Sequence, residues 1–207
     1  MIGGIGSHPK AMHAVVCDCG DNRYSQSSRT AQGIQHSSHD RIGGDDEVGL
    51  LRPDVWAAIA PLCPVAPYFG ESHARNVFNV PVYFHHGDAD ATVPVAISRD
   101  WLKLMKDAGV NAQLKEYPGV KHNVWEPAYQ DAAIFQWFAQ HKRNRFPDQV
   151  KYASQSLRHP GAYWVKFDAI PAGGTATIDA RFTAQNRIDV TSENLPAFSL
   201  ALKGHPK

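Results

Sequence analysis

Two short stretches, HGDADATVP at residues 86–94 and PGVKH at residues 118–122, decide how this chain is organised. Each of them follows an apolar run that is typical of a buried strand, so their polar residues come where a predicted strand ends. In open α/β folds the carboxyl ends of parallel strands meet at one edge of the sheet, where ligands bind. We therefore expect Asp90 and His122 to lie close together at that edge.

Predicted strands and helices alternate around these stretches. Strands are expected over Ala57–Leu62, Val80–His86 and Gln113–Tyr117, and amphipathic helices over Val95–Ala108 and Ala128–His141. Strands that alternate with helices indicate a parallel α/β sheet. The predicted fold class is therefore α/β.

Helical patterns stop near residue 147, and short runs with β-branched and aromatic residues follow, separated by turn signals. The expected strands cover residues 150–157, 162–170, 175–182, 187–191 and 197–202. Residues 147–207 are therefore predicted to form a small antiparallel β-rich module. We expect it to serve packing or oligomerisation rather than substrate binding.

The first 52 residues differ from the rest of the chain. They are rich in Gly, Ser, His, Asp and Arg and show little apolar periodicity, and the composition changes at Pro53. Such a composition is typical of irregular segments. The predicted organisation is an irregular segment at 1–52, an α/β domain at 53–146 and the β-rich module at 147–207.

The composition excludes several classes of function. A formal net charge of +1 gives no excess of positive charge of the kind that binds nucleic acid or an anionic membrane. No apolar run approaches the roughly 18 residues of a membrane span, and the first residues do not resemble a signal peptide. Three cysteines do not form a disulfide framework. The sequence assigns no cellular compartment.

Asp90 and then His122, each after a predicted strand, suit the roles of acid and base in nucleophilic hydrolysis. A carboxylate holds an imidazole in one tautomer and stabilises the imidazolium, while the imidazole moves the proton between nucleophile and leaving group. His122 is the predicted base. Asp88 competes with Asp90 for the role of the acid, but the two-residue gap before Val93-Pro94 favours Asp90.

Residues 53–145 resemble the C-terminal half of the α/β-hydrolase superfamily, most of all its prolyl-oligopeptidase-like, dienelactone-hydrolase-like and polyhydroxybutyrate-depolymerase-like esterases. The resemblance rests on PDVWAAIAP at 53–61, VPVYFHHG with Asp90 and Val93-Pro94, and YPG with HNVW at 117–125. It implies a truncated α/β-hydrolase sheet, no cofactor and a small-molecule ester as substrate. It also implies that Asp90 is the triad acid and His122 the base.

The nucleophile of that family stands on a G-x-S-x-G turn, and no such pentapeptide occurs in the 207 residues. Two residues are considered as substitutes. Cys63 follows the strand Ala57–Leu62 at the same predicted edge as Asp90 and His122, and a thiolate paired with His122 would be a competent nucleophile. Ser72 stands on the next loop.

Two other functions stay open. In the first, zinc held by Cys63, Asp90 and His122, with loop histidines, activates water to cleave an ester or phosphoester. The loop histidines considered are His36, His39, His73 and His86, although His85 and His86 are more simply read as one packed ring and one ring near the site edge. In the second, the chain is a non-catalytic remnant of a hydrolase.

A truncated sheet has a consequence for assembly. The strand Ala57–Leu62 is expected to have an unpaired edge where its neighbour in the family lies. An exposed apolar edge invites pairing with another chain. We therefore expect a homodimer or a higher homo-oligomer.

Overall fold

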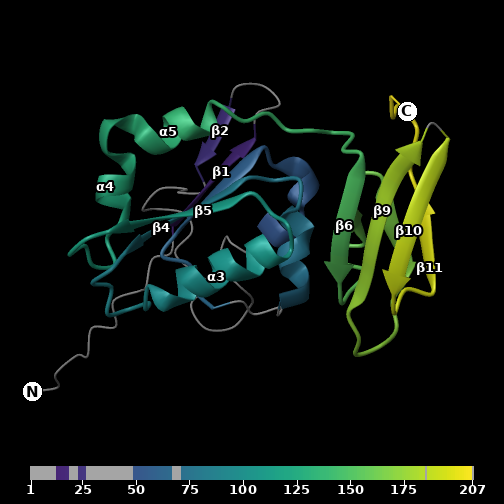
Figure 1. Ribbon diagram of the computed structural model, residues 1–207, viewed down its shortest axis with the longest axis horizontal. Coiled ribbons are helices and arrows are strands. Elements are labelled where there is room, and N and C mark those ends of the chain that lie inside the picture. Colours follow the sequence, from purple (N-terminus) through teal and green to yellow (C-terminus); the bar gives the residue numbers. More distant parts are fainter. Residues whose placement is uncertain (1–12, 19–22, 27–48, 67–70, 185, 207) are drawn as a thin grey trace, which may run out of the picture.

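The computed structural model describes residues 13–18, 23–26, 49–66, 71–184 and 186–206. A mixed sheet with the strand order β2-β1-β3-β4-β5 lies at the centre of the region before residue 147 (Figure 1). Its strands are β1 (His13–Asp18), β2 (Arg23–Gln26), β3 (Ala58–Leu62), β4 (Val82–Gly87) and β5 (Ala112–Tyr117). The strands β3, β4 and β5 are parallel, as predicted.

Helices cover both faces of this sheet (Figure 1). Successive side chains of a strand point to opposite faces. On one face Ile59 of β3 packs in a cluster with Trp101 and Met105 of α3 (Ala96–Asp107). On the other face Ala60 packs in a cluster with residues of α4 (Trp125–Tyr129) and α5 (Ala133–Phe138). The three layers confirm the α/β fold class.

Three short 3₁₀ helices complete this region. They are η1 (Pro53–Val55), η2 (Glu71–Val77) and η3 (Gln130–Ala132). The single helix expected over Ala128–His141 is wrong, because η3 separates α4 from α5. Asp131 and Ala132 have positive φ angles of 54° and 56°, which an α-helix does not allow. Apolar periodicity continues across this break and does not reveal it.

The unpaired edge expected for β3 is also wrong. β1 pairs with β3 in antiparallel register, with His13 opposite Leu62 and Cys17 opposite Ala58. The strand comes from the segment that the composition indicates as irregular. Its backbone covers the edge that was expected to drive oligomerisation, so β3 provides no reason for assembly. The division of the chain into three regions and the homo-oligomer stay predictions.

Residues after 147 form two three-stranded antiparallel sheets around a separate core. One sheet has the order β10-β9-β6, and the other has the order β11-β8-β7. The strands are β6 (Gln149–Ser154), β7 (Gly161–Ala162), β8 (Val165–Ala169), β9 (Ala176–Ala184), β10 (Arg187–Glu193) and β11 (Ala197–Leu200). This arrangement confirms the antiparallel module.

One predicted strand of the module is divided in two. Residues 162–170 form the end of β7, a two-residue turn at Tyr163-Trp164, and β8. Tyr163 has a φ of 56°, a conformation that glycine and asparagine adopt far more readily. The turn carries neither residue, so the sequence gives no signal for it.

The strand β6 of the module lies beside η2 (Figure 1), and side-chain hydrogen bonds join β6 to η2 and to the residues after it. The side chain of Asn76 accepts from the N–H of Ala153 at 2.6 Å and donates to its carbonyl at 2.9 Å, as a paired strand would. Asn79 donates to the carbonyl of Gln149 at 2.8 Å. These contacts cover the β6 edge of the sheet.

Among the described residues, no helix has both the length and the apolar character needed to cross a membrane.

Candidate active site

Two loops at the carboxyl edge of the sheet are joined by backbone hydrogen bonds. The loop after β4 donates from Asp88 N to Tyr117 O at 3.1 Å and from Ala89 N to Val120 O at 3.0 Å. A Cβ added to Gly87 would lie 2.2 Å from the Val120 carbonyl oxygen, so only glycine fits between the loops. The acid loop and the histidine loop therefore form one rigid unit.

Asp90 lies inside this unit and its side chain is fully buried. Its Oδ1 accepts hydrogen bonds from the backbone N–H groups of Thr92 at 2.7 Å and Val93 at 2.9 Å. Its Oδ2 lies 2.7 Å from Nδ1 of His122. The structure thus brings Asp90 and His122 together, as the spacing of the two loops predicts.

Asp88 has a different contact. Its side chain accepts a hydrogen bond from the N–H of Gly119 at 2.7 Å and stays exposed. It therefore ties the two loops together at the surface. Of the two carboxylates, only Asp90 is hydrogen-bonded to the imidazole of His122.

The surroundings of Asp90 keep it ionised. Burial alone raises its pKa, but the hydrogen bonds from Val93 N, His122 and Thr92 N favour the anion and outweigh burial. The pKa of Asp90 is therefore lowered below its usual value. A carboxylate at this position accepts the Nδ1–H of His122 throughout the neutral range.

His122 is held by its Nδ1 and by the edge of Trp125, whose ring centroid lies 6.1 Å away. A neutral imidazole that donates from Nδ1 carries its lone pair on Nε2. This Nε2 is buried and has no hydrogen-bond partner within the part of the chain that the structure describes. It is the atom that takes the proton from a nucleophile in a catalytic triad.

A second imidazole lies on the other side of the Asp90 carboxylate. Nε2 of His86 is 3.4 Å from Oδ2 of Asp90 and 2.9 Å from the carbonyl oxygen of Val93. Nδ1 of His86 lies 2.6 Å from Oγ of Ser98 on α3. Both side chains of the His86–Asp90 pair are fully buried. The sequence predicted that one of His85 and His86 lies near the site edge, and His86 is the one that does.

His85, the neighbour of His86, has a structural position. Its Nδ1 lies 2.8 Å from the hydroxyl of Tyr117, and its ring packs between Tyr83 and Tyr117. Burial, with a smaller contribution from the charge of Lys115, lowers the pKa of His85 to about 3. It is therefore a neutral packed ring.

Cys63 lies at the predicted edge but does not reach the free nitrogen of His122. Its Sγ is 3.6 Å from the backbone carbonyl oxygen of His122 and within 4.8 Å of an Asp90 carboxylate oxygen. Burial, assisted by the nearby Asp90, raises the pKa of the Cys63 thiol to about 12. A protonated thiol beside the acid is poorly placed for nucleophilic attack.

Ser72 has another partner. Its Oγ lies 3.3 Å from Nδ1 of His73, at the start of η2. No hydrogen bond joins Ser72 to His122 among the residues that the structure describes. The remaining predicted loop histidines, His36 and His39, lie outside those residues.

The possible metal ligands include one close group, namely Cys63, His86 and Asp90, whose ligand atoms lie within 4.8 Å of one another. The histidine and the carboxylate of this group already make other contacts. The contact with the Val93 carbonyl requires a proton on Nε2 of His86, its Nδ1 lies 2.6 Å from Ser98 Oγ, and both Asp90 oxygens accept hydrogen bonds. A metal ion would have to displace these contacts, so the group as it is arranged does not fit a metal ion.

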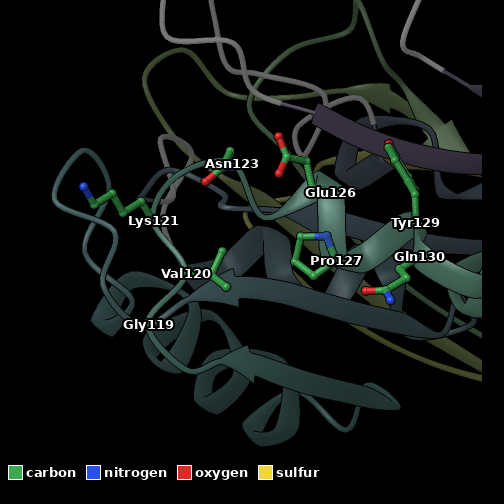
Figure 2. Close-up of a pocket in the computed structure, with 8 residues that line it drawn as sticks. All are labelled: Gly119, Val120, Lys121, Asn123, Glu126, Pro127, Tyr129 and Gln130. Carbon is green, nitrogen blue, oxygen red and sulfur yellow. The ribbon is translucent and has the colours of Figure 1, made fainter.

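A surface depression of about 770 Å³ adjoins the histidine loop (Figure 2). The residues that line it come from the loop after β5 and from α4 and its end: Gly119, Val120, Lys121, Asn123, Glu126, Pro127, Tyr129 and Gln130. Its lining contains both neighbours of His122 in the sequence. Asp90 and His122 themselves do not line it.

One stretch of the chain matches a known protein family. Residues 54–145 match the family described as the Dienelactone hydrolase family. This stretch contains β3, β4, β5 and both loops of the site. The match agrees with the predicted resemblance to dienelactone-hydrolase-like esterases. No curated protein matches the chain.

Three solved structures are similar to part of the chain. A thermostable esterase is 22% identical over 46% of this chain and 27% of its own, with a TM-score of 0.41. A variant of SOBER1 from Arabidopsis thaliana is 26% identical over 39% of each chain, with a TM-score of 0.33. Esterase PE8 is 23% identical over 40% of this chain and 39% of its own, with a TM-score of 0.31. The chain thus spans well under half the length of each of these proteins.

Proposed function

We propose that this chain supplies the acid and the base for hydrolysis of a small carboxylic ester. The observation that carries the proposal is the 2.7 Å contact between Asp90 Oδ2 and His122 Nδ1, with Nε2 of His122 left without a described partner. The match of residues 54–145 to the Dienelactone hydrolase family supports ester chemistry at this pair.

In the proposed reaction, Nε2 of His122 accepts the proton of a hydroxyl as its oxygen attacks the ester carbonyl carbon. The tetrahedral adduct collapses when the bond to the alcohol oxygen breaks and His122 returns the proton to that oxygen. Water then repeats the two steps and releases the acid. Asp90 stays ionised and stabilises the imidazolium of His122 in each step.

The attacking hydroxyl is assigned to a residue of this chain beyond those that the structure describes. The raised pKa of Cys63 and the contact of Ser72 with His73 speak against these two residues. The antiparallel direction of β1 adds a constraint, because its last residues lie opposite the amino end of β3. A nucleophile just after β1 would therefore be at the wrong edge of the sheet.

The hydrogen bonds that His86 and Asp90 already make leave metal-assisted hydrolysis as the weaker alternative. A chelator separates the two mechanisms. Hydrolysis of p-nitrophenyl acetate by the purified chain should persist in EDTA and should lose about 10³-fold in kcat/KM in the His122→Ala variant. Loss of activity in EDTA would favour the metal mechanism.

His159→Ala is a matched control, because imidazoles on any protein surface hydrolyse activated esters slowly. His159 is half-buried in the β-rich module. Its removal should leave the rate unchanged. Labelling with a fluorophosphonate, followed by peptide mass spectrometry, would then locate the attacking hydroxyl. No hydrolysis and no labelling in any condition would contradict the proposal and favour a non-catalytic remnant.

A further inference from the structure

Among the described residues, no strand covers the outer edge of β10 in the C-terminal module. The strand β10 pairs with β9 on one side and lies at the end of the order β10-β9-β6, near the far end of the molecule from β5 (Figure 1). The opposite edge, β6, is covered by Asn76 and Asn79. Six of the seven residues of β10 are exposed. Such an edge offers unpaired backbone N–H and C=O groups to another strand.

The core-facing side of β10 is incompletely covered. Val190 lies opposite Ala180, and Ile188 lies opposite Phe182. Both partners on β9 are buried in the core of the module, so Val190 and Ile188 point to the same side of the sheet. Ile188 packs against the core, but Val190 is 36% exposed. The apolar side chain of Val190, in the middle of the edge strand, has Ala180 on one side and no described strand on the other.

The charges on β10 are complementary to those of a second β10 in the register that pairs the whole strand. Antiparallel pairing about a two-fold axis at Val190 places Arg187 opposite Glu193 of the second copy, and does so twice. Pairing about Ile188 would also place Arg187 opposite an acidic residue, Asp189, but would pair only residues 187–189. Pairing about Asp189 would place Asp189 opposite itself. Pairing about Thr191 would place Asp189 opposite Glu193. Like charges directly opposite each other destabilise a sheet.

The five-stranded sheet ends at β5, which is also an edge strand. The charges of β5 do not favour pairing with a second β5. A two-fold axis at Leu114 would place Lys115 opposite Gln113, and an axis at Lys115 would place Lys115 opposite itself. Glu116 is already held by Arg99, whose guanidinium donates to both of its carboxylate oxygens.

We propose that two copies of this chain form a symmetrical dimer through β10. The two β10-β9-β6 sheets join into one continuous antiparallel sheet, the two Val190 side chains contact each other, and Arg187 of each copy pairs with Glu193 of the other. Arg187 keeps its present hydrogen bond to Asp189 of its own chain, at 2.9 Å, because a guanidinium has five N–H donors. Two-fold pairing uses both free edges and closes the assembly at two copies.

The dimer does not depend on the proposed function, and its test measures association alone. Multi-angle light scattering after size exclusion, over a range of concentrations, should show a dimer that dissociates on dilution. Arg187→Glu and Glu193→Arg should each raise the dissociation constant about tenfold or more, since each puts two like-charge pairs across the axis. The double variant should restore dimerisation.

Two further variants complete the design. Val190→Lys places two ammonium groups against each other at the axis and should give a monomer. Arg145→Glu makes the same charge change as Arg187→Glu, but at an exposed position before β6, the strand at the opposite edge of the sheet from β10. It should leave the dimer intact. Circular dichroism of every variant checks that the module is folded.

Three results would overturn the proposal. The first is a monomer at all concentrations. The second is an oligomer whose dissociation constant is unchanged in both Arg187→Glu and Val190→Lys. The third is a double variant that stays as weak as the single variants, which would rule out the register in which Arg187 meets Glu193.

Discussion

The Asp90→Asn substitution tests how the carboxylate controls the tautomer of His122. Oδ1 of Asp90 accepts two backbone N–H groups, and Oδ2 accepts the Nδ1–H of His122. An amide has a single acceptor oxygen. If that oxygen stays with the two backbone donors, the NH₂ group faces Nδ1 of His122 and requires a lone pair there. The proton of the imidazole then moves to Nε2, which no longer accepts a proton.

The expected loss in kcat/KM for ester hydrolysis is about 10³- to 10⁴-fold, the order observed when the carboxylate of a serine-protease triad is replaced by an amide. Loss of the charge-assisted hydrogen bond also lowers the free energy of unfolding by about 1.5–3 kcal/mol. Asp88→Asn is the matched control. Asp88 accepts from Gly119 N through one oxygen, and an asparagine oxygen does the same.

Two measurements read out this prediction. The first is the rate on p-nitrophenyl acetate, and the second is ¹⁵N NMR of the imidazole, which identifies the protonated nitrogen whether or not the protein is active. We expect Nδ1–H in the parent protein and in Asp88→Asn, and Nε2–H in Asp90→Asn. An unchanged tautomer of His122 in Asp90→Asn would refute the reasoning. So would a rate within tenfold of the parent rate.

Three other predictions concern stability. Gly87→Ala should lower the free energy of unfolding, measured by urea titration, by about 1–3 kcal/mol, because the new Cβ would lie 2.2 Å from the Val120 carbonyl oxygen. An unchanged urea midpoint would show that the loops after β4 and β5 separate easily. Asn76→Ala should cost about 2–4 kcal/mol, since it removes both bonds to Ala153 inside a buried interface, and a loss under 1 kcal/mol would mean that packing alone holds the module. The lowered pKa of Asp90 means that its contribution to stability is complete above about pH 4, the ordinary carboxyl pKa, and disappears as the pH falls through the folded-state value. The difference in unfolding free energy between the parent and Asp90→Asn should therefore shrink as the solution is acidified, and a constant difference would contradict this.

The sequence was informative where the signal is local. Each loop of the site follows directly from a strand, so the order of strands in a parallel sheet brings Asp90 and His122 to one edge. The bounds of β3, β4 and α3 agree with the predicted ranges within two residues. Apolar runs and helical periodicity carry this information because they report burial of a single element.

The sequence failed where the structure depends on backbone conformation without a compositional signal. Tyr163 in the turn at Tyr163-Trp164 and both residues of the break at Asp131-Ala132 have positive φ angles, and neither site carries a glycine or an asparagine. No sequence pattern indicated that β1 pairs with β3, because the residues of a six-residue strand do not identify the strand with which it pairs.

By itself, the sequence determined the α/β order of elements, the acid-then-base loops and the change to an antiparallel module, since each is encoded in contiguous residues. The sequence favoured Asp90 over Asp88 as the acid. Tertiary structure alone decided how each carboxylate is held, because the packing of the two loops buries Asp90 against His122 and leaves Asp88 exposed beside Gly119. It also decided that Cys63 lies beside the acid, and that β10 rather than β3 is left uncovered. Those outcomes depend on how distant segments pack, and packing is not encoded in any one segment.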